Sequence, residues 1–206
     1  MEKIAKDWSG DSNSVFKTLG ASNHAEEERQ NEDYYATDPI AARLLLQIEE
    51  LDKNTPIWEC AAGENHLANV FKESGYKVRT SDLVKRTEST EQLDFLSDEV
   101  TEWTGNIITN PPYNKASEFI DKAMSIIGDG DKCIMFLKLQ FLEGKSRRGL
   151  FEKYVPKTIW VSSSRIFCAK NGDFQEAKRI GGSAVAYAWY VWEKGYRGDT
   201  AVKWFN

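Results

Sequence analysis

The residues best suited to chemistry are Asn110, Pro111, Pro112 and Tyr113, which directly follow the apolar run NIIT. The two prolines fix the backbone and remove two N–H donors, so the loop presents hydrogen-bond acceptors, including the Asn110 side-chain oxygen. Acceptors that hold both hydrogens of a planar amine would draw its nitrogen towards a tetrahedral, nucleophilic state. This chemistry needs no strong general base, and the loop has neither histidine nor carboxylate. The pattern predicts a site that activates an amine on an aromatic ring, with Tyr113 stacked on that ring.

A second candidate site is the small-residue turn Ala61, Ala62 and Gly63, which joins an expected strand to an expected helix. Such a turn lets the backbone approach a ligand closely. Asp82 follows the next expected strand, where a carboxylate commonly accepts hydrogen bonds from a ribose diol. An ordinary strand-to-helix connection would have the same small residues, so this assignment depends on the loop at 110–113.

The elements that must position these residues alternate along the chain. Helical periodicity and apolar runs predict helices at 40–50, 66–74 and 116–127 and strands at 57–60, 77–81, 106–109 and 133–139. This order predicts an α/β fold with a mostly parallel twisted sheet and helices on both faces. Two later aromatic and β-branched runs, at 158–162 and 184–192, predict an antiparallel strand pair at the C-terminal end. Ligands of such sheets bind beyond the carboxyl ends of the strands, where the loop at 110–113 is expected.

Composition limits the classes of protein to consider. A chain of 206 residues with 41% hydrophobic residues is long enough for one packed domain, and no apolar run is long enough to span a membrane. The N-terminus has no secretory signal pattern. Three widely spaced cysteines and two histidines favour neither a disulfide framework nor a metal site, so we expect a cytoplasmic protein without a metal. Residues 1–33 are polar and irregular and are expected to form an extended arm, with a single domain over 34–206.

Charge is segregated along the chain. The net charge is −5, yet residues 138–179 contain ten Lys and Arg against four Asp and Glu. A local positive field can bind a polyanion whatever the net charge, although a charged segment can also be a simple solvated face. The predicted phosphate contacts are Lys145, Arg147, Arg148, Arg165 and Lys170.

The sequence resembles a known family. The NPPY loop resembles motif IV of amino-methyltransferases with the Rossmann-like fold, and the whole chain resembles the small phage and prophage-encoded DNA N6-adenine methyltransferases. The resemblance covers residues 17–24, 34–39 and 186–196 as well as NPPY. It implies transfer of a methyl group from S-adenosylmethionine to the N6 amine of adenine in DNA, as an adenine-specific DNA methyltransferase of a bacterial or phage-infected cell does, for instance in restriction-modification. The adenine would be flipped into a pocket at NPPY.

The resemblance also implies roles for individual residues. Glu59 would face the methionine ammonium of the cofactor, Asp82 its ribose, and Asp94 its adenine amine. The full cofactor set is Tyr35, Thr37, Glu59, Ala61, Gly63, Asp82, Asp94, Phe95 and Asn110. The catalytic set is Asn110, Pro111, Pro112 and Tyr113, and the target base would stack between Tyr113 and Phe167. The sequence departs from the family's E-x-x-x-G-x-G in having Asn65 for the last glycine. Asn tolerates the left-handed backbone that such a turn requires.

Several alternatives stay open at the level of sequence. NPPY is shared with RNA base amino-methyltransferases and with protein glutamine N5-methyltransferases, and Phe167 is as well explained by a core phenylalanine. Little chain follows Tyr113 beyond what completes the sheet, so DNA recognition must be compact, in loops near 143–182. The recognised DNA sequence, its strandedness, the choice between monomer and homodimer and the biological role are not determined by these patterns.

Overall fold

The computed structural model describes residues 35–166, 168–170, 174 and 185–206. The expected arm at 1–33 lies outside these ranges. The α-helices are α2 (Ile40–Ile48), α3 (His66–Glu73), α4 (Ala116–Ile126) and α5 (Arg148–Lys153). Three short 3-10 helices are η1 (Tyr113–Lys115), η2 (Leu139–Leu142) and η3 (Lys145–Arg147). The strands are β1 (Tyr35–Thr37), β2 (Ile57–Glu59), β3 (Val78–Asp82), β4 (Glu91–Gln92), β5 (Asn106–Thr109), β6 (Lys132–Lys138), β7 (Thr158–Ser162), β8 (Cys168–Lys170), β9 (Tyr187–Glu193) and β10 (Ala201–Phe205).

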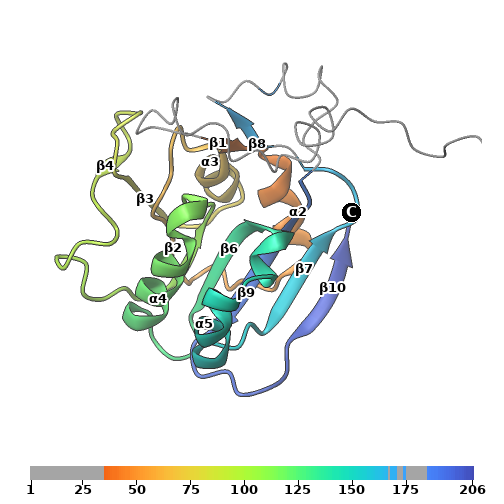
Figure 1. The fold of residues 1–206 in the computed structure, drawn as a ribbon. Helices are drawn as coiled ribbons and strands as arrows, with labels where there is room; N and C mark the ends of the chain where they lie inside the picture. Colours follow the sequence, from red (N-terminus) through yellow and green to blue (C-terminus); the bar gives the residue numbers. More distant parts are fainter. Residues whose placement is uncertain (1–34, 167, 171–173, 175–184) are drawn as a thin grey trace, which may run out of the picture.

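The main sheet has eight strands in the order β10-β7-β9-β6-β5-β2-β3-β4, and β1 pairs with β8 in a separate two-stranded sheet (Figure 1). Its pairs are parallel except where β9 lies antiparallel between β6 and β7. The predicted parallel sheet and the antiparallel C-terminal pair are confirmed. The sequence did not predict α5, β4, β10 or the β1–β8 pair.

Helices cover both faces of the sheet, as the sequence predicts. Along β6, Cys133, Met135 and Leu137 pack on the face that carries α4, whereas Ile134 and Phe136 pack on the face that carries α2 and α3. Strand side chains point to alternate faces, so a strand buried on both faces is an unbroken apolar run. That is why β6 and β9 were recognisable. Within the described ranges, no helix is long and apolar enough to cross a membrane.

Residues at two helix boundaries explain where those helices begin and end. The Asp38 carboxylate accepts a hydrogen bond from the backbone N–H of Ile40 at 3.0 Å, where α2 begins. Gly75, directly after α3 and its capping residue, has a φ of +87°, a backbone conformation that side chains with a Cβ rarely adopt. Asn65, at the start of α3, has a φ of 66°. The expected left-handed backbone at this position is therefore confirmed.

The side to which the chain crosses the sheet reverses between β2 and β5. From β2 the chain crosses over through α3 to β3, and from β5 it crosses through α4 to β6 on the other side. The helices α3 and α4 pack on opposite faces, although β2 and β5 are neighbours. This is the switch point of an open α/β sheet, where ligands bind beyond the carboxyl ends of the strands.

Candidate functional site

Asp82, at the end of β3, organises the turn after β2. One carboxylate oxygen accepts a hydrogen bond from the backbone N–H of Gly63 at 2.8 Å, and the other accepts one from Val84 at 3.0 Å. Gly63 has a φ of 52°, a left-handed conformation that glycine adopts without steric cost. The structure thus brings together Gly63 and Asp82, two of the residues expected to bind the cofactor. It also gives Asp82 a role in holding the turn, beyond the predicted ribose contact.

The turn is fixed on its other side by Asn65, whose side chain is buried. The amide nitrogen donates to the hydroxyls of Thr87, Ser89 and Thr90 at 2.7–3.2 Å. These hydroxyls belong to the loop that joins β3 to β4. A glycine at this position could adopt the same backbone but would lose these bonds. The departure from the glycine pattern therefore connects the turn to the neighbouring loop.

Glu59, at the carboxyl end of β2, is 2% exposed, and its Oε2 has no hydrogen-bond partner. Burial raises the pKa of this carboxyl well above its ordinary value, although a hydrogen bond from the backbone of Ala68 opposes the rise. A buried acceptor without a partner costs free energy, and a cationic ligand would remove that cost. The side chain therefore fits the ammonium group of a cofactor such as S-adenosylmethionine.

Asn110 follows β5, the strand next to β2. Its side-chain nitrogen donates a hydrogen bond to the hydroxyl of Thr37, in β1, at 2.8 Å. The hydroxyl of Thr109, the residue before it, is buried and has no partner. Sequence reasoning missed Thr109, because a threonine inside an apolar run is most simply explained as a strand former.

Tyr113 lies between the two sheets. Its hydroxyl donates to the sulfur of Cys168, in β8, at 3.5 Å. The Lys138 ammonium lies 4.8 Å from the centre of its ring, and the ring of Tyr187 lies 6.3 Å away. Burial raises the pKa of the Tyr113 hydroxyl well above its ordinary value, so the ring stays neutral. A base that stacks on Tyr113 would therefore take the position of the Lys138 ammonium or of the Tyr187 ring.

A pocket of about 150 Å³ opens beside the NPPY loop and is lined by Tyr113, Leu137, Lys138, Gln140, Phe141 and Arg147. Of these lining residues, only Tyr113 and Arg147 were predicted as site residues. Lys138 and Phe141 were missed, because their position next to NPPY arises from the pairing of β5 with β6 and cannot be inferred from spacing alone. Its lining combines the aromatic rings of Tyr113 and Phe141 with the cationic side chains of Lys138 and Arg147.

Arg147 is held within the protein. Its guanidinium donates to the backbone carbonyls of Gln140, Phe141 and Glu143 and lies 4.9 Å from the centre of the Phe141 ring. Gly144 has a φ of +136°, and a Cβ there would come within 2.6 Å of the Arg147 guanidinium. Arg147 therefore fixes the loop at 140–147, and its availability for a phosphate contact is reduced.

The other predicted phosphate contacts that the structure describes have more exposed side chains than Arg147. Lys145 and Arg165 are exposed. Arg148 is 81% exposed and forms an ion pair with Glu152 at 2.7 Å. Phe167 lies outside the described residues, as do residues 171–173 and 175–184 of the expected recognition segment, and only the backbone of Lys170 is described.

Phe95 and Asp94 differ in exposure. Phe95 is 1% exposed and packs against Trp58 and Phe119, with ring centres 5.3 and 5.0 Å away. Asp94 is exposed and accepts a hydrogen bond from the backbone of Leu96 at 2.9 Å. The structure thus makes Phe95 part of the hydrophobic core, and its contact with a cofactor ring stays a prediction. Of Tyr35, only the position in β1 is described, and Ala61 is partly buried in the turn after β2.

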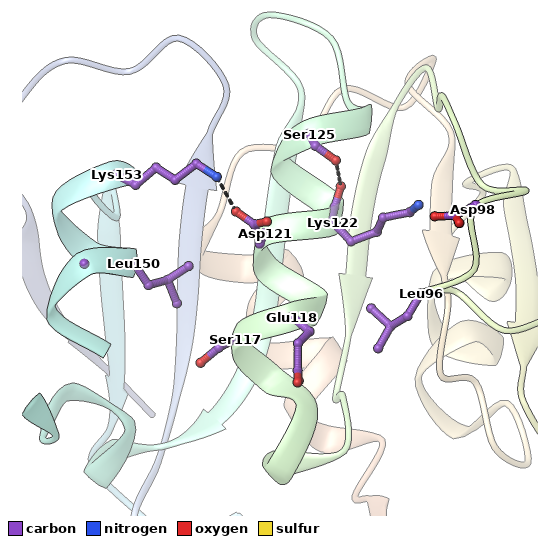
Figure 2. A pocket seen from close by; sticks show the side chains of 10 residues that line it. Leu96, Asp98, Ser117, Glu118, Asp121, Lys122, Ser125, Leu150 and Lys153 are labelled. Atoms are coloured by element: carbon purple, nitrogen blue, oxygen red, sulfur yellow. Dashed lines mark hydrogen bonds and ion pairs between the residues drawn. The ribbon is translucent and has the colours of Figure 1, made fainter. Parts of the chain in front are cut away.

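A larger open pocket of about 620 Å³ lies elsewhere, along the outer side of α4. It contains none of the predicted site residues. Figure 2 shows that Asp121, on α4, points towards Lys153 of α5, with which it forms an ion pair at 2.6 Å. Its lining mixes both signs of charge. In the described part of the chain, no group of three or more His, Cys, Asp or Glu side chains is arranged to hold a metal ion.

No protein-family model and no curated protein matches the chain. Many solved structures are similar in fold, and the following three are examples. A predicted O-methyltransferase from Agrobacterium tumefaciens aligns with a TM-score of 0.57 at 13% identity, over 79% of this chain and 85% of that one. A proposed class I S-adenosylmethionine-dependent methyltransferase from Listeria monocytogenes aligns with a TM-score of 0.52 at 15% identity, over 80% and 63%. A proposed RNA methyltransferase from Pyrococcus horikoshii aligns with a TM-score of 0.52 at 14% identity, over 74% and 80%.

These similarities are similarities of fold. The chain has the Rossmann-like fold of methyltransferases, with a mostly parallel sheet and helices on both faces. A fold hosts many chemistries, so the reaction must be argued from the side chains at the switch point.

Proposed function

We propose that this protein transfers a methyl group from S-adenosylmethionine to the N6 amine of adenine in DNA. The observation that supports the proposal most directly is that two polar side chains lie at the ends of neighbouring strands. Glu59 supplies a buried carboxylate oxygen without a partner at the end of β2, and Asn110 opens a proline-fixed loop at the end of β5. The first suits the cofactor's ammonium group and the second an amine to be methylated.

The residues of this chain bind and orient the reactants. Asp82 is suited to the ribose, because each of its carboxylate oxygens retains a second lone pair beside the backbone bond that it accepts. Asn110 would accept a hydrogen from the adenine amine and make the nitrogen more nucleophilic, and Tyr113 would stack on the base. When bound, S-adenosylmethionine supplies a methyl group on a sulfonium: its S–C bond breaks as the N–C bond forms, and the amine proton leaves to solvent.

A second candidate is methylation of a base amine in RNA. It is favoured by the fold similarity to the proposed RNA methyltransferase of Pyrococcus horikoshii. The amine chemistry would be the same, so the two candidates differ only in the nucleic acid that reaches the NPPY pocket. DNA is preferred here because the resemblance over 17–24, 34–39 and 186–196 is to DNA methyltransferases.

The test is an acceptor panel. The protein is incubated with methyl-labelled S-adenosylmethionine and duplex DNA, single-stranded DNA, RNA or protein, and the product is digested and analysed as nucleosides or amino acids. Labelled N6-methyladenine from DNA supports the proposal. Label only in RNA replaces it by the second candidate, and label in glutamine or nowhere overturns both.

The same assay tests the site. Asn110→Ala should lower the single-turnover rate by about 100- to 1000-fold, by analogy with the loss of one preorganised hydrogen-bonding group. Its affinity for the cofactor should stay nearly unchanged. Asn110→Asp should keep more activity than Asn110→Ala, since a carboxylate still accepts hydrogens. Asn69→Ala, on the exposed side of α3, is the matched control. A wild-type rate in Asn110→Ala would show that NPPY is only a structural turn.

A further inference from the structure

The two-stranded sheet holds both ends of the NPPY loop. Thr37 and Cys168 are directly opposite each other in the β1–β8 pair. Thr37 accepts a hydrogen bond from the Asn110 side-chain nitrogen at 2.8 Å, and Cys168 accepts one from the Tyr113 hydroxyl at 3.5 Å. One cross-strand pair therefore contacts the first and the last residue of the loop.

The Thr37 hydroxyl contacts both Cys168 and Asn110. Burial raises the pKa of the Cys168 thiol, and hydrogen bonds from Tyr113, Tyr187 and Thr37 oppose the rise. A hydroxyl has one donor and two acceptor lone pairs, so that of Thr37 can donate to sulfur while its oxygen accepts from Asn110. Thr37 is 3% exposed, so water does not compete for either bond.

The role of Thr37 as an acceptor matters because the Asn110 side-chain amide has a donor, its NH2 group, and an acceptor, its oxygen. With its nitrogen held by Thr37, the Asn110 amide turns its oxygen away from β1. An amide rotated by half a turn would present its own hydrogens to the hydrogens of the substrate amine, and the two donors would repel. Pro111 fixes the backbone after Asn110, so rotation of the side-chain amide is the main freedom left to the residue.

We propose that Thr37 is a positioning residue that sets the orientation of the Asn110 amide, so that its oxygen faces the amine to be methylated. The proposal rests on the proposed function and assigns Thr37 a task other than the cofactor contact that the resemblance implies. Cys168 supports it as the acceptor that orients the Thr37 hydroxyl.

The first experiment is single-turnover methylation at saturating cofactor and nucleic acid. Thr37→Val keeps the side-chain shape and removes the hydroxyl, and it should lower the rate by roughly 10- to 100-fold, as expected for a misaligned catalytic group. Thr37→Ser should restore most of that rate. Thr158→Val is the control, because Thr158 is 7% exposed and lies at the opposite end of β7 from the carboxyl edge. A Thr37→Val effect confined to cofactor affinity would overturn the proposal.

The second experiment combines Thr37→Val with Asn110→Asp. A carboxylate accepts through both oxygens, so it has no wrong orientation for Thr37 to prevent. In the Asn110→Asp background, Thr37→Val should therefore change the rate by less than about threefold, a non-additive result. Equal effects in both backgrounds would show that Thr37 acts through general packing.

A third measurement does not depend on activity. In protein labelled with ¹⁵N-asparagine, the side-chain signal of Asn110 is identified by its loss in Asn110→Asp. Its hydrogens should exchange with solvent more slowly than those of exposed Asn69, and Thr37→Val should remove this protection. Rapid exchange in the wild type would refute the bond itself. A wild-type protein that methylates no acceptor would instead refute the proposed function. The bond between Asn110 and Thr37 would then have no catalytic role, although the exchange data would still show whether it forms.

Discussion

Replacing Glu59 by glutamine should stabilise the protein and weaken its binding of S-adenosylmethionine. The side chain is 2% exposed, and one oxygen has no partner. Glutamine has nearly the same shape but cannot ionise, so Glu59→Gln removes the free-energy cost of desolvating the charge, which is about 1.4 kcal/mol per unit by which the pKa is raised. For a domain of this size 1 kcal/mol corresponds to about 2–4 °C in Tm, so Glu59→Gln should melt several degrees higher at neutral pH.

The gain in Tm from Glu59→Gln should depend on pH, and the raised pKa of Glu59 fixes the direction of that dependence. Burial raises the Glu59 pKa in the folded protein above its ordinary value of 4.5, so the folded state holds this proton at a pH where the unfolded chain has lost it. The stability of the wild type therefore falls as pH rises through this interval and then levels off. The Tm difference between Glu59→Gln and wild type should be small below the ordinary pKa and largest at neutral or alkaline pH.

Cofactor binding should change in the opposite direction. Loss of a charge-assisted hydrogen bond of about 1.5–3 kcal/mol corresponds to a Kd raised about 10- to 150-fold. Differential scanning calorimetry across pH and titration calorimetry with S-adenosylmethionine measure the two effects. Glu49→Gln is the contrast, because both Glu49 oxygens are bonded, one to Lys132 at 2.6 Å and the other to Trp160 at 2.9 Å, so its loss should lower the Tm. A Glu59→Gln variant with wild-type stability and affinity would refute the reasoning.

Three further predictions concern the remaining parts of the site. Asp82→Asn should weaken S-adenosylmethionine binding by about 1.5–3 kcal/mol in titration calorimetry, and an unchanged Kd would exclude the ribose contact. Replacing Lys145 and Arg148 by Ala should reduce the slope of log affinity for DNA against log salt by about two units, whereas Arg147→Ala should mainly lower the Tm, because its guanidinium binds three backbone carbonyls. Tyr113→Ala should raise the KM for DNA as well as lower kcat, whereas Tyr113→Phe should keep base stacking; equal effects of both substitutions would show that the hydroxyl matters more than the ring.

The parts of the fold that the sequence predicted are those in which local pattern and burial agree. Buried helices and strands gave clear periods, as in β6, where alternate side chains pack on opposite faces. The parts that it missed are short or depend on distant partners. β1 has three residues and exists through its pairing with β8, more than 130 positions along the chain, and α5 has six residues. No local pattern marks such elements, because their stability comes from the contacts that they make.

The candidate site likewise combines residues that the sequence predicted with residues that it missed. NPPY and the turn after β2 could be recognised from residue types, because prolines restrict the backbone and small residues let it approach a ligand closely wherever they occur. The neighbours that complete the site, Lys138, Thr109 and Cys168, have no unusual local sequence. Arg147 was assigned to a phosphate contact on charge alone, since the three carbonyls that it binds became visible only with the fold of residues 140–147.

The distribution of unsatisfied polar groups gives an independent reason to locate the site at the switch point. Glu49, a carboxylate whose side chain is 10% exposed, uses both oxygens in hydrogen bonds, as a folded protein generally requires of buried acceptors. Among the described residues, Glu59 Oε2 and Thr109 Oγ1 are buried without partners and lie at the carboxyl ends of two neighbouring strands, whereas Ser97 Oγ, which also has no partner, lies in the loop between β4 and β5. The same edge lies between two helices that pack on opposite faces. Because these unsatisfied groups lie at the switch point of the sheet, a polar ligand that bonds to them there would stabilise the folded state as it binds.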